Sequence, residues 1–445
     1  MSFRSLTPPL LVGLLASSIG WAAAQSTAPM QVASPGTPAD VMRVSLPQVL
    51  AAARTNLDVA LAQRQLASAQ ADVTSADRAP LPSLSAGVGQ IDLKNGNGRG
   101  NPMTQKTYDK SVGLDWTWER GNKRELRTEA ARRSSEAVAA DLDDVTLQQQ
   151  LAALGGFYDL LAAQERVAEV TQIERSAAEL ARAAERRLQA GDLSAQDSLR
   201  TDIEAQRARS ELRLAELERQ RAAVALAQIT ALGSAAQLQA QADWPSLQTI
   251  APTPVVDALV ENRADVRAAR SRVVAATAAQ QGAMALRKSD LTWGISYDHL
   301  PGTSTALVSL RMSMPLQWGY AYQGEIARAS AQLELAEQAL EKTRRLARSE
   351  LERLLYELQT TAERALSYDV QILPRARRVA EGAELAYRKG ALSLTDLLDA
   401  RRTLRATALD ALVARSEHAK AWGSWRLRTE TPVSSSRLEP PRNRP

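Results

Sequence analysis

The sequence predicts a mainly α-helical protein with a small β part, built from one unit that occurs twice. A glycine-centred phrase at residues 183–199 returns at residues 382–398, each time between long segments rich in Ala, Leu, Arg and Glu. Four short segments between such helical stretches change to a period of two, which is typical of strands. Each unit is therefore expected to contain a short helix, a β-hairpin, a long helix, a turn and a returning helix.

The repeated phrase has the local chemistry of a sharp turn between two helices. A glycine suits the left-handed residue that ends a helix. A Ser three residues before an Asp then resembles a capping box that starts the next helix, with Asp in place of the usual Glu or Gln. The residues matched between the two copies are Gly191/Gly390, Ala184/Ala383, Glu185/Glu384, Leu193/Leu392, Ser194/Ser393, Asp197/Asp396 and Leu199/Leu398.

Composition excludes several classes of protein. The 445 residues carry 55 basic and 50 acidic side chains, a near balance that indicates solvated helix faces and not nucleic-acid binding. The chain has no cysteine, so thiol catalysis, disulfides and thiolate metal sites are excluded. We expect His299 in a loop or rim and His418 on a helix surface. Because they lie on different elements, they do not supply the convergent ligands that a zinc site needs. No phosphate loop or nucleophile elbow is present, so neither an enzyme nor a cofactor is expected.

The N-terminal segment, residues 1–24, is typical of a secretory signal peptide that ends at Ala22–Ala24. An uncleaved anchor helix is the alternative. The rest of the chain divides by composition and by the repeat. We expect a flexible linker at 25–44, a first repeat at 45–232, an inter-repeat linker at 233–254, a second repeat at 255–428 and a disordered tail at 429–445.

Strands are expected at about 83–92, 111–118, 291–299 and 305–314. Each has one apolar face and one small or polar face, and each has about the length of a tilted strand that crosses an outer membrane. Aromatic side chains lie at or beside these strands, as they do in an interfacial girdle: Trp116, Trp118, Trp293, Tyr297 and Trp318. The alternative is a set of edge strands in a soluble sheet that packs its aromatic side chains inward.

Counting the strands indicates an oligomer. Single-chain membrane barrels begin at about 8 strands, and an open sheet in lipid leaves costly unsatisfied backbone groups. Partner strands from other subunits are therefore required; three copies would give twelve strands, and two copies would also reach the minimum. The long helix that follows each hairpin, roughly 70 residues at ~1.5 Å per residue, would extend about 100 Å from the membrane.

The order of elements, the duplication and the phrase Ala386-Tyr-Arg-Lys-Gly-Ala-Leu-Ser-Leu-Thr-Asp-Leu-Leu-Asp-Ala-Arg-Arg-Thr-Leu404 resemble the TolC-type outer-membrane efflux factors. The resemblance covers nearly the whole mature chain. It implies a homotrimer with a 12-stranded outer-membrane β-barrel, continued by a periplasmic α-helical coiled-coil tunnel. The helical turns would form an inner entrance that meets a periplasmic adaptor and an inner-membrane pump. The segment Trp118-Glu-Arg-Gly-Asn-Lys-Arg also resembles the cation-efflux branch of this family.

Carboxylates near the turns are the candidate functional groups. Asp396 and Asp399 are three residues apart and share one helix face. In a trimer they would form an acidic ring that attracts cations. The alternatives are a helix cap for Asp396 and an exposed ion pair with Arg402 for Asp399.

The family resemblance adds further residues to this entrance. It places Asp197 and Tyr387 in the gate, whereas Leu392 replaces an Arg that some members use there. Arg388, Lys389, Arg401 or Arg402 are near enough to substitute for that Arg. The small apolar residues at the turns are candidate adaptor contacts, with intrachain packing as the alternative: Ala190, Leu193, Ala391 and Leu392.

Two hypotheses from different classes follow. The first is a passive outer-membrane exit duct of a tripartite efflux or type I secretion system, gated at the helical turns. The second is a soluble periplasmic coiled-coil scaffold or adaptor, which explains the helices but not two Trp-rich hairpins at matched positions. Both leave the cargo open among metal ions, drugs and polypeptides.

Overall fold

The structure is a computed structural model that describes residues 42–96, 98, 108–234, 237–247, 256–301 and 304–429. The predicted signal peptide, residues 25–41 of the predicted linker and residues 430–445 of the predicted tail lie outside the described residues. Residue 429, assigned to the tail by the sequence, is instead the last residue of a helix. The described part is mostly helical with a small sheet, which confirms the predicted fold class at this level.

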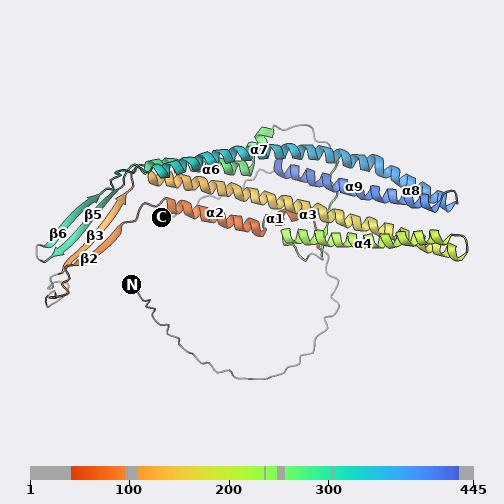
Figure 1. Cartoon of the computed structure of the whole chain (residues 1–445), viewed down its shortest axis with the longest axis horizontal. Helices are drawn as coiled ribbons and strands as arrows, with labels where there is room; N and C mark the ends of the chain where they lie inside the picture. The colour runs from red at the N-terminus through yellow and green to blue at the C-terminus, as the bar shows by residue number, and fades with distance from the viewer. Residues whose placement is uncertain are drawn as a thin grey trace, which may run out of the picture. The chain divides into compact units, whose positions relative to one another are not determined.

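Four helices lie side by side next to the sheet (Figure 1). They are α2 (Leu57–Ala76), α3 (Lys123–Gln189), α6 (Ala264–Ala285) and α7 (Gln323–Ser367), and each packs against the next in that order. The 67 residues of α3 give a helix about 100 Å long. This helix continues past α2 and α6 and carries the first turn far from the sheet.

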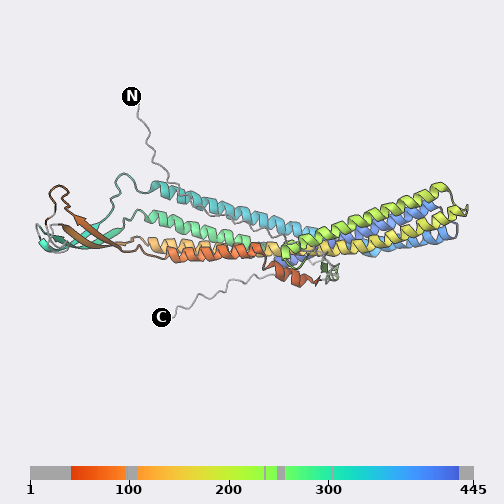
Figure 2. The ribbon, with the colours of Figure 1, turned by 90° about the horizontal axis from the view of Figure 1, so that it is seen from below.

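Two helical hairpins form the end remote from the sheet (Figure 2). The first joins α3 to α4 (Ala195–Thr230), and the second joins α8 (Leu373–Arg388) to α9 (Leu394–Thr429). Helix α8 continues α7 through a π-helical turn, η1 (Tyr368–Ile372). Pro374 lies at the start of α8, and its missing N–H accounts for a local change of helix type there.

A short two-stranded sheet and two short helices lie between these ends. Strand β1 (Met42–Val44) pairs in parallel with β4 (Leu238–Ala240), and α1 (Leu46–Ala53) and α5 (Val256–Asn262) precede α2 and α6. The predicted flexible linker is therefore wrong for residues 42–44. The predicted inter-repeat linker likewise contains ordered structure, because β4 falls inside it. The pairing satisfies backbone groups on one side of each strand, and the side chain of Gln164 bonds the N–H and the carbonyl of Ala240 on the other side of β4.

Two hydrophobic cores fix the middle of the long helices. The first places Val49 of α1 and Leu238 of β4 against Leu154 and Phe157 of α3. The second places Val260 of α5 against Leu351 and Leu358 of α7 and Trp425 of α9. Large apolar side chains concentrate in these two places, whereas the remaining helix contacts rely mainly on alanine. Alanine lets helices approach closely and has the highest helix propensity.

The four predicted strands form one antiparallel sheet in the order β2-β3-β5-β6. The bounds are Ser83–Gly89, Asp109–Trp118, Leu291–Leu300 and Ser304–Ser313, so β2 ends before the predicted residue 92. Strands β3 and β5 come from different halves of the chain and pair along nine residues. Within the described residues, β2 and β6 are each paired on one side only.

Candidate functional site

Both turns have the same backbone geometry. Gly191 and Gly390 adopt φ of 80° and 73°, in the left-handed region that other residues avoid. The N–H of Asp192 donates to the carbonyl of Arg187 at 2.8 Å, and the N–H of Ala391 donates to that of Ala386 at 2.9 Å. These bonds span five residues and satisfy carbonyls that the helix end leaves free, as in a Schellman motif.

The helix that follows each turn begins with a serine cap. The hydroxyl of Ser194 accepts from the N–H of Asp197 at 3.1 Å and donates to its carboxylate at 2.8 Å. Ser393 and Asp396 repeat this arrangement at 3.2 and 2.7 Å. Ser393 is therefore the cap, and Asp396 is bonded to it through its N–H and its carboxylate while it remains exposed. The two alternatives considered from the sequence are thus compatible, because the cap leaves the carboxylate open to solvent.

Asp399 is exposed on the next turn of α9. Its expected partner, Arg402, instead pairs with Glu204 of α4. Asp399 has no ion pair among the described side chains. It therefore remains available to solvent.

Polar contacts join the two hairpins near the turns. Arg187 donates to the Tyr387 hydroxyl at 3.2 Å, and its guanidinium lies 6.0 Å from the centre of that ring. Arg200 donates to the hydroxyl of Thr395 at 3.2 Å. Further from the turns, Arg405 of α9 pairs with Glu211 of α4, as Arg402 does with Glu204. The turns are thus connected by side chains of both halves.

The sequence-predicted residues are partly brought together by this arrangement. Tyr387, which the family resemblance places in the gate, contacts Arg187 and none of the four cations suggested near the second turn. Arg187, Arg200 and Glu204 were missed, because contacts between the halves leave no local spacing signal. Ala190 and Ala391 are exposed at the turns, whereas Leu193 and Leu392 are half-buried.

An open cavity of about 270 Å³ lies between the two hairpins, beside these contacts. Leu180 and Leu398 supply apolar lining, and Glu204, Glu384 and Arg402 supply charges. The hairpins are therefore held together by discrete polar links and are incompletely packed against each other. Such an interface can open without exposing a continuous hydrophobic core.

At the other end, the sheet separates side chains by polarity. Leu84, Leu114, Ile295 and Leu310 form one row across all four strands, and their exposed fractions range from 42% to 81%. The predicted girdle residues Trp116 and Trp293 lie directly opposite each other on the same face. The exposed fractions of the predicted girdle side chains are 43% for Trp116, 62% for Trp118, 40% for Trp293, 53% for Tyr297 and 86% for Trp318.

The opposite face of the sheet is polar. Arg311 of β6 donates to Asp115 of β3 at 2.8 Å and reaches across Gly294 of the intervening strand. A Cβ at position 294 would stand 2.3 Å from the Asp115 carboxylate, so only glycine leaves room for this bridge. Thr117 and Thr292 share a hydrogen bond at 2.9 Å on the same face. One face of the sheet thus suits lipid and the other suits water.

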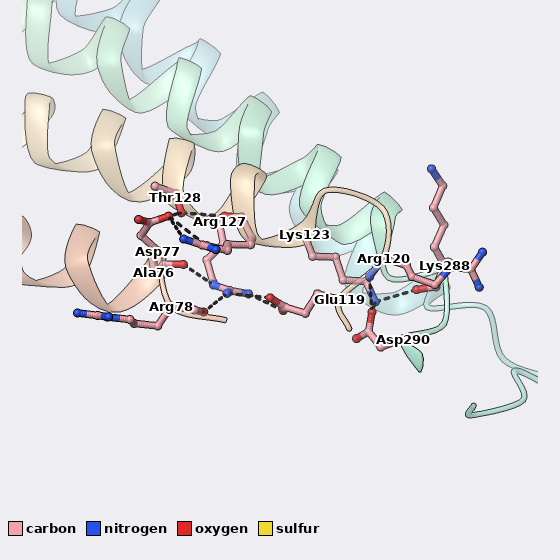
Figure 3. Close-up of polar contacts among 11 residues, drawn as sticks. Ala76, Asp77, Arg78, Glu119, Arg120, Lys123, Arg127, Thr128, Lys288 and Asp290 are labelled. Atoms are coloured by element: carbon pink, nitrogen blue, oxygen red, sulfur yellow. Dashed lines mark hydrogen bonds and ion pairs between the residues drawn. The ribbon is translucent and has the colours of Figure 1, made fainter. Parts of the chain in front are cut away.

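A dense polar network joins the sheet to the helices (Figure 3). Arg127 of α3 donates to Glu119 at 2.9 Å and to the carbonyls of Ala76 and Arg78 at 3.0 and 2.9 Å. Lys123 pairs with Asp290 at 2.7 Å, and the backbone N–H of Arg120 donates to the same carboxylate at 3.0 Å. The segment that resembles the cation-efflux branch therefore forms the junction between β3, α3, α2 and the start of β5.

His418 was expected on a helix surface, and that prediction is wrong. Its side chain is fully buried in α9, and burial lowers the pKa of the imidazole. Neither ring nitrogen of His418 has a hydrogen-bond partner among the described residues. Among the described residues no group of three or more His, Asp or Glu is placed to hold a metal ion.

Comparison with known proteins decides the family. A family model described as outer membrane efflux protein matches residues 46–232 and 255–424. The chain belongs to the outer membrane efflux protein family. The predicted resemblance, the exit-duct role and an outer-membrane location with a periplasmic helical part are thereby confirmed. No helix in the described ranges has the length and apolar character needed to cross a bilayer.

Individual relatives agree with this assignment. The cobalt-zinc-cadmium resistance protein CzcC of Cupriavidus metallidurans is 26% identical over 360 residues, which cover 79% of this chain and 82% of CzcC. The outer-membrane channel OprN has 20% identity and a TM-score of 0.74, covering 86% of this chain and 89% of OprN. VceC of Vibrio cholerae has 18% identity and a TM-score of 0.72, covering 86% and 95%. The two structural likenesses show a shared fold.

Proposed function

We propose that three copies of this efflux protein form a twelve-stranded barrel in the outer membrane, continued by a helical tunnel across the periplasm. The observation that carries the proposal is the four-stranded sheet, with one exposed apolar face and, within the described residues, an unpaired outer edge on both β2 and β6. Backbone groups at such edges must be paired in lipid. The edge strands of neighbouring copies supply that pairing, and three copies exceed the minimum of about 8 strands.

The helical part supports the same assembly. Helix α4 carries five exposed apolar side chains at helical spacing, so they form one stripe: Leu199, Ile203, Leu214, Leu217 and Val224. A stripe of this length on a water-soluble helix is expected to be covered. Packing against a neighbouring copy covers it and builds the tunnel wall. The two ranges matched by the family model, 46–232 and 255–424, fit the predicted repeats and support a duplicated unit.

The turns form the gate of this duct. The link between Arg187 and Tyr387, and the ion pair of Arg402 with Glu204, hold the two hairpins of each copy together. Opening separates the hairpins at these links. Asp396 and Asp399 line the entrance as an acidic ring, and Asp197 lies in the gate at the start of α4, where its N–H and its carboxylate are bonded to the capping Ser194. The exposed Ala190 and Ala391, with the flanking Leu193 and Leu392, contact the tips of a periplasmic adaptor.

The cargo of the duct is a divalent metal cation. This proposal is supported by the 26% sequence identity with a cobalt-zinc-cadmium resistance protein and by the carboxylates Asp396 and Asp399 at the entrance. The chain carries out no catalytic step. An inner-membrane pump supplies the energy, the adaptor couples the pump to the duct, and the duct conducts passively.

Fractionation with unboiled gel electrophoresis tests the assembly. The expected result is a band of about three times the monomer mass in the outer-membrane fraction, which collapses to the monomer on boiling. A soluble monomer in the periplasmic fraction would contradict the barrel. Cargo is tested separately, by measuring Zn²⁺ and Co²⁺ tolerance of cells with and without the chain alongside tolerance to an organic cation such as ethidium. Loss of tolerance to ethidium alone would contradict the metal assignment.

A further inference from the structure

Four cations lie at the boundary between the sheet and the helices with exposed side chains: Arg78, Arg120, Arg287 and Lys288. Their neighbours Lys123, Arg124 and Arg127 are paired with carboxylates. In the described part of the chain the four exposed side chains have no ion-pair partner. Figure 3 shows the side chains of Arg78 and Lys288 directed away from the network that joins the sheet to the helices.

The network itself keeps these cations together. The carbonyl of Lys288 accepts from the Lys123 ammonium at 2.8 Å, and the carbonyl of Arg78 accepts from Arg127 at 2.9 Å. Arg120 is held by its backbone N–H on Asp290. The backbone of three of the four cations is thus fixed, while their charged groups remain free. Removing these charges therefore leaves the contacts of the junction in place.

Exposed indoles flank the same cations. Trp118, which is 62% exposed, lies two residues before Arg120. On the other side, Gln317 donates to the carbonyl of Leu286 at 3.0 Å, and Ser289 donates to the carbonyl of Pro315 at 2.8 Å. These bonds hold the segment that leads to Trp318 beside Lys288. Trp318 is 86% exposed, so an indole stands near each side of the charged group.

The four cations lie just beyond the helix end of the sheet's apolar face. Trp118 and Leu291 pair opposite each other at the helix end of β3 and β5, and they form the last apolar row of the sheet. The cations follow directly beyond this row, on the side of the helices. Tryptophan and basic side chains in this order are typical of the level where hydrocarbon gives way to lipid headgroups.

We propose that Arg78, Arg120, Arg287 and Lys288 form a cationic collar that binds the phosphates of anionic phospholipids in the periplasmic leaflet of the outer membrane. The proposal rests on the proposed barrel, because it requires the sheet to lie in the membrane. Four unpaired cations favour lipids that carry a net negative charge over zwitterionic lipids. The backbone groups of Arg78, Arg120 and Lys288 are hydrogen-bonded within the junction of sheet and helices. Because of these bonds, lipid bound by the side chains also fixes the depth of the sheet relative to the helices.

Tryptophan quenching by brominated lipids tests the collar in the full-length protein. The protein is reconstituted into vesicles in which brominated phosphatidylglycerol or brominated phosphatidylcholine replaces part of the unlabelled lipid, and the relative binding constant of the two is measured. Trp118 and Trp318 report on lipid at the collar. A preference for phosphatidylglycerol of about fivefold for each engaged cation is expected for the wild type.

The test variant removes three charges, Arg120→Gln, Arg287→Gln and Lys288→Gln. Its matched control removes the same charges from exposed positions of α4 and α7 that lack an ion pair in the described ranges, Arg213→Gln, Arg221→Gln and Lys342→Gln. We expect the preference to fall to about fivefold, the share of the remaining Arg78, in the test variant and to persist at the wild-type level in the control. Equal preferences in wild type and test variant would overturn the collar.

Two other outcomes separate the collar from the rest of the assembly. If the test variant loses its heat-sensitive oligomer equally in phosphatidylcholine and phosphatidylglycerol, the cations pair with a neighbouring copy and the lipid assignment is wrong. If the wild type fails to insert into neutral phosphatidylcholine vesicles as a heat-sensitive oligomer, the proposed barrel itself fails. Insertion together with an absent lipid preference would overturn the collar alone.

Discussion

At the scale of single residues, glycine marks the closest approach of two helices. Gly423 of α9 is buried against Leu154 of α3, and a Cβ at position 423 would stand 2.4 Å from one Leu154 methyl group. Leu154 is itself 2% exposed, so it has little space to move aside. The first hydrophobic core therefore depends on the absence of a side chain at this position.

We predict that Gly423→Ala lowers stability. Overpacking costs about 1–3 kcal/mol, which exceeds the gain of about 1 kcal/mol from a better helix former. The control is Gly382→Ala in α8, where a Cβ meets nothing within 4 Å and the helix gain stands alone. Thermal unfolding followed by intrinsic fluorescence should give a lower Tm for the first variant and a slightly higher Tm for the second. Similar shifts in both would contradict the close contact.

Burial of His418 predicts a pH dependence. Because the pKa of the folded imidazole lies below its usual 6.5, the folded state binds a proton less readily than the unfolded chain. The stabilising contribution is therefore present above pH 6.5 and decreases as the pH falls through that value. Each unit of pKa lowering corresponds to about 1.4 kcal/mol.

The measurement compares Tm at pH 7.5 and pH 5.5 for the wild type and for His418→Gln, which keeps a neutral hydrogen-bonding side chain. Tm should fall more on acidification in the wild type than in the variant. Parallel decreases would show that other groups account for the pH response.

At the scale of elements, the junction of sheet and helices differs between the two halves. In the first half, Arg127 joins α3 to Glu119 and to two carbonyls at the end of α2. In the second half, neutral groups join the same elements, as Gln317 does with Ser289 at 3.2 Å. Hydrogen bonds to charged groups are stronger than neutral ones. The first junction is therefore the stiffer of the two.

We predict that Arg127→Ala lowers stability by about 1–3 kcal/mol, because it removes charge-assisted bonds and leaves two carbonyls without their donor. The matched control is Arg345→Ala, which removes an exposed pair with Glu341 within one helix. Such pairs contribute about 0.5 kcal/mol or less. The temperature at which the oligomer dissociates on unboiled gels should fall clearly for Arg127→Ala alone. Equal effects would mean that the junction is not a stabilising element.

Local chemistry explains which elements the sequence could predict. The turn glycines, the serine caps and the alternating strands depend on a few neighbouring residues, and Gly191, Gly390, Ser194 and Ser393 are found as expected. Strand β1 was missed because three residues in a Ser- and Pro-rich region carry no periodic signal. It is ordered only by pairing with β4, almost 200 residues later in the chain.

At the scale of the whole molecule, contacts between the halves are the part that sequence reasoning missed. Arg187 and Tyr387 belong to different repeats, and so do Arg402 and Glu204. Each repeat predicts its own turn, but neither predicts how the two turns face each other. The same holds for His418, whose burial depends on packing of α9 in the middle of the molecule. The contacts between the two turns are therefore set by tertiary packing of the two halves.

The entrance leads to a prediction for the assembled duct. Asp396 is engaged by Ser393, so its removal changes both a cap and a charge. Asp399 is exposed without such a bond and offers a cleaner test. Carboxylates around a narrow entrance raise the local concentration of cations and lower that of anions. In the proposed trimer, Asp399→Asn removes three negative charges at the proposed entrance and leaves the helix cap intact.

We predict that Asp399→Asn lowers the cation preference of the channel in planar bilayers, measured as the reversal potential in a salt gradient. The control is Asp410→Asn, which removes an equally exposed carboxylate from the same helix about three turns further from the entrance. Its reversal potential should match that of the wild type. Raising the salt concentration should reduce the difference between wild type and Asp399→Asn, because screening weakens the field of exposed charges. A reversal potential unchanged by Asp399→Asn at low salt would remove this residue from the selectivity of the entrance.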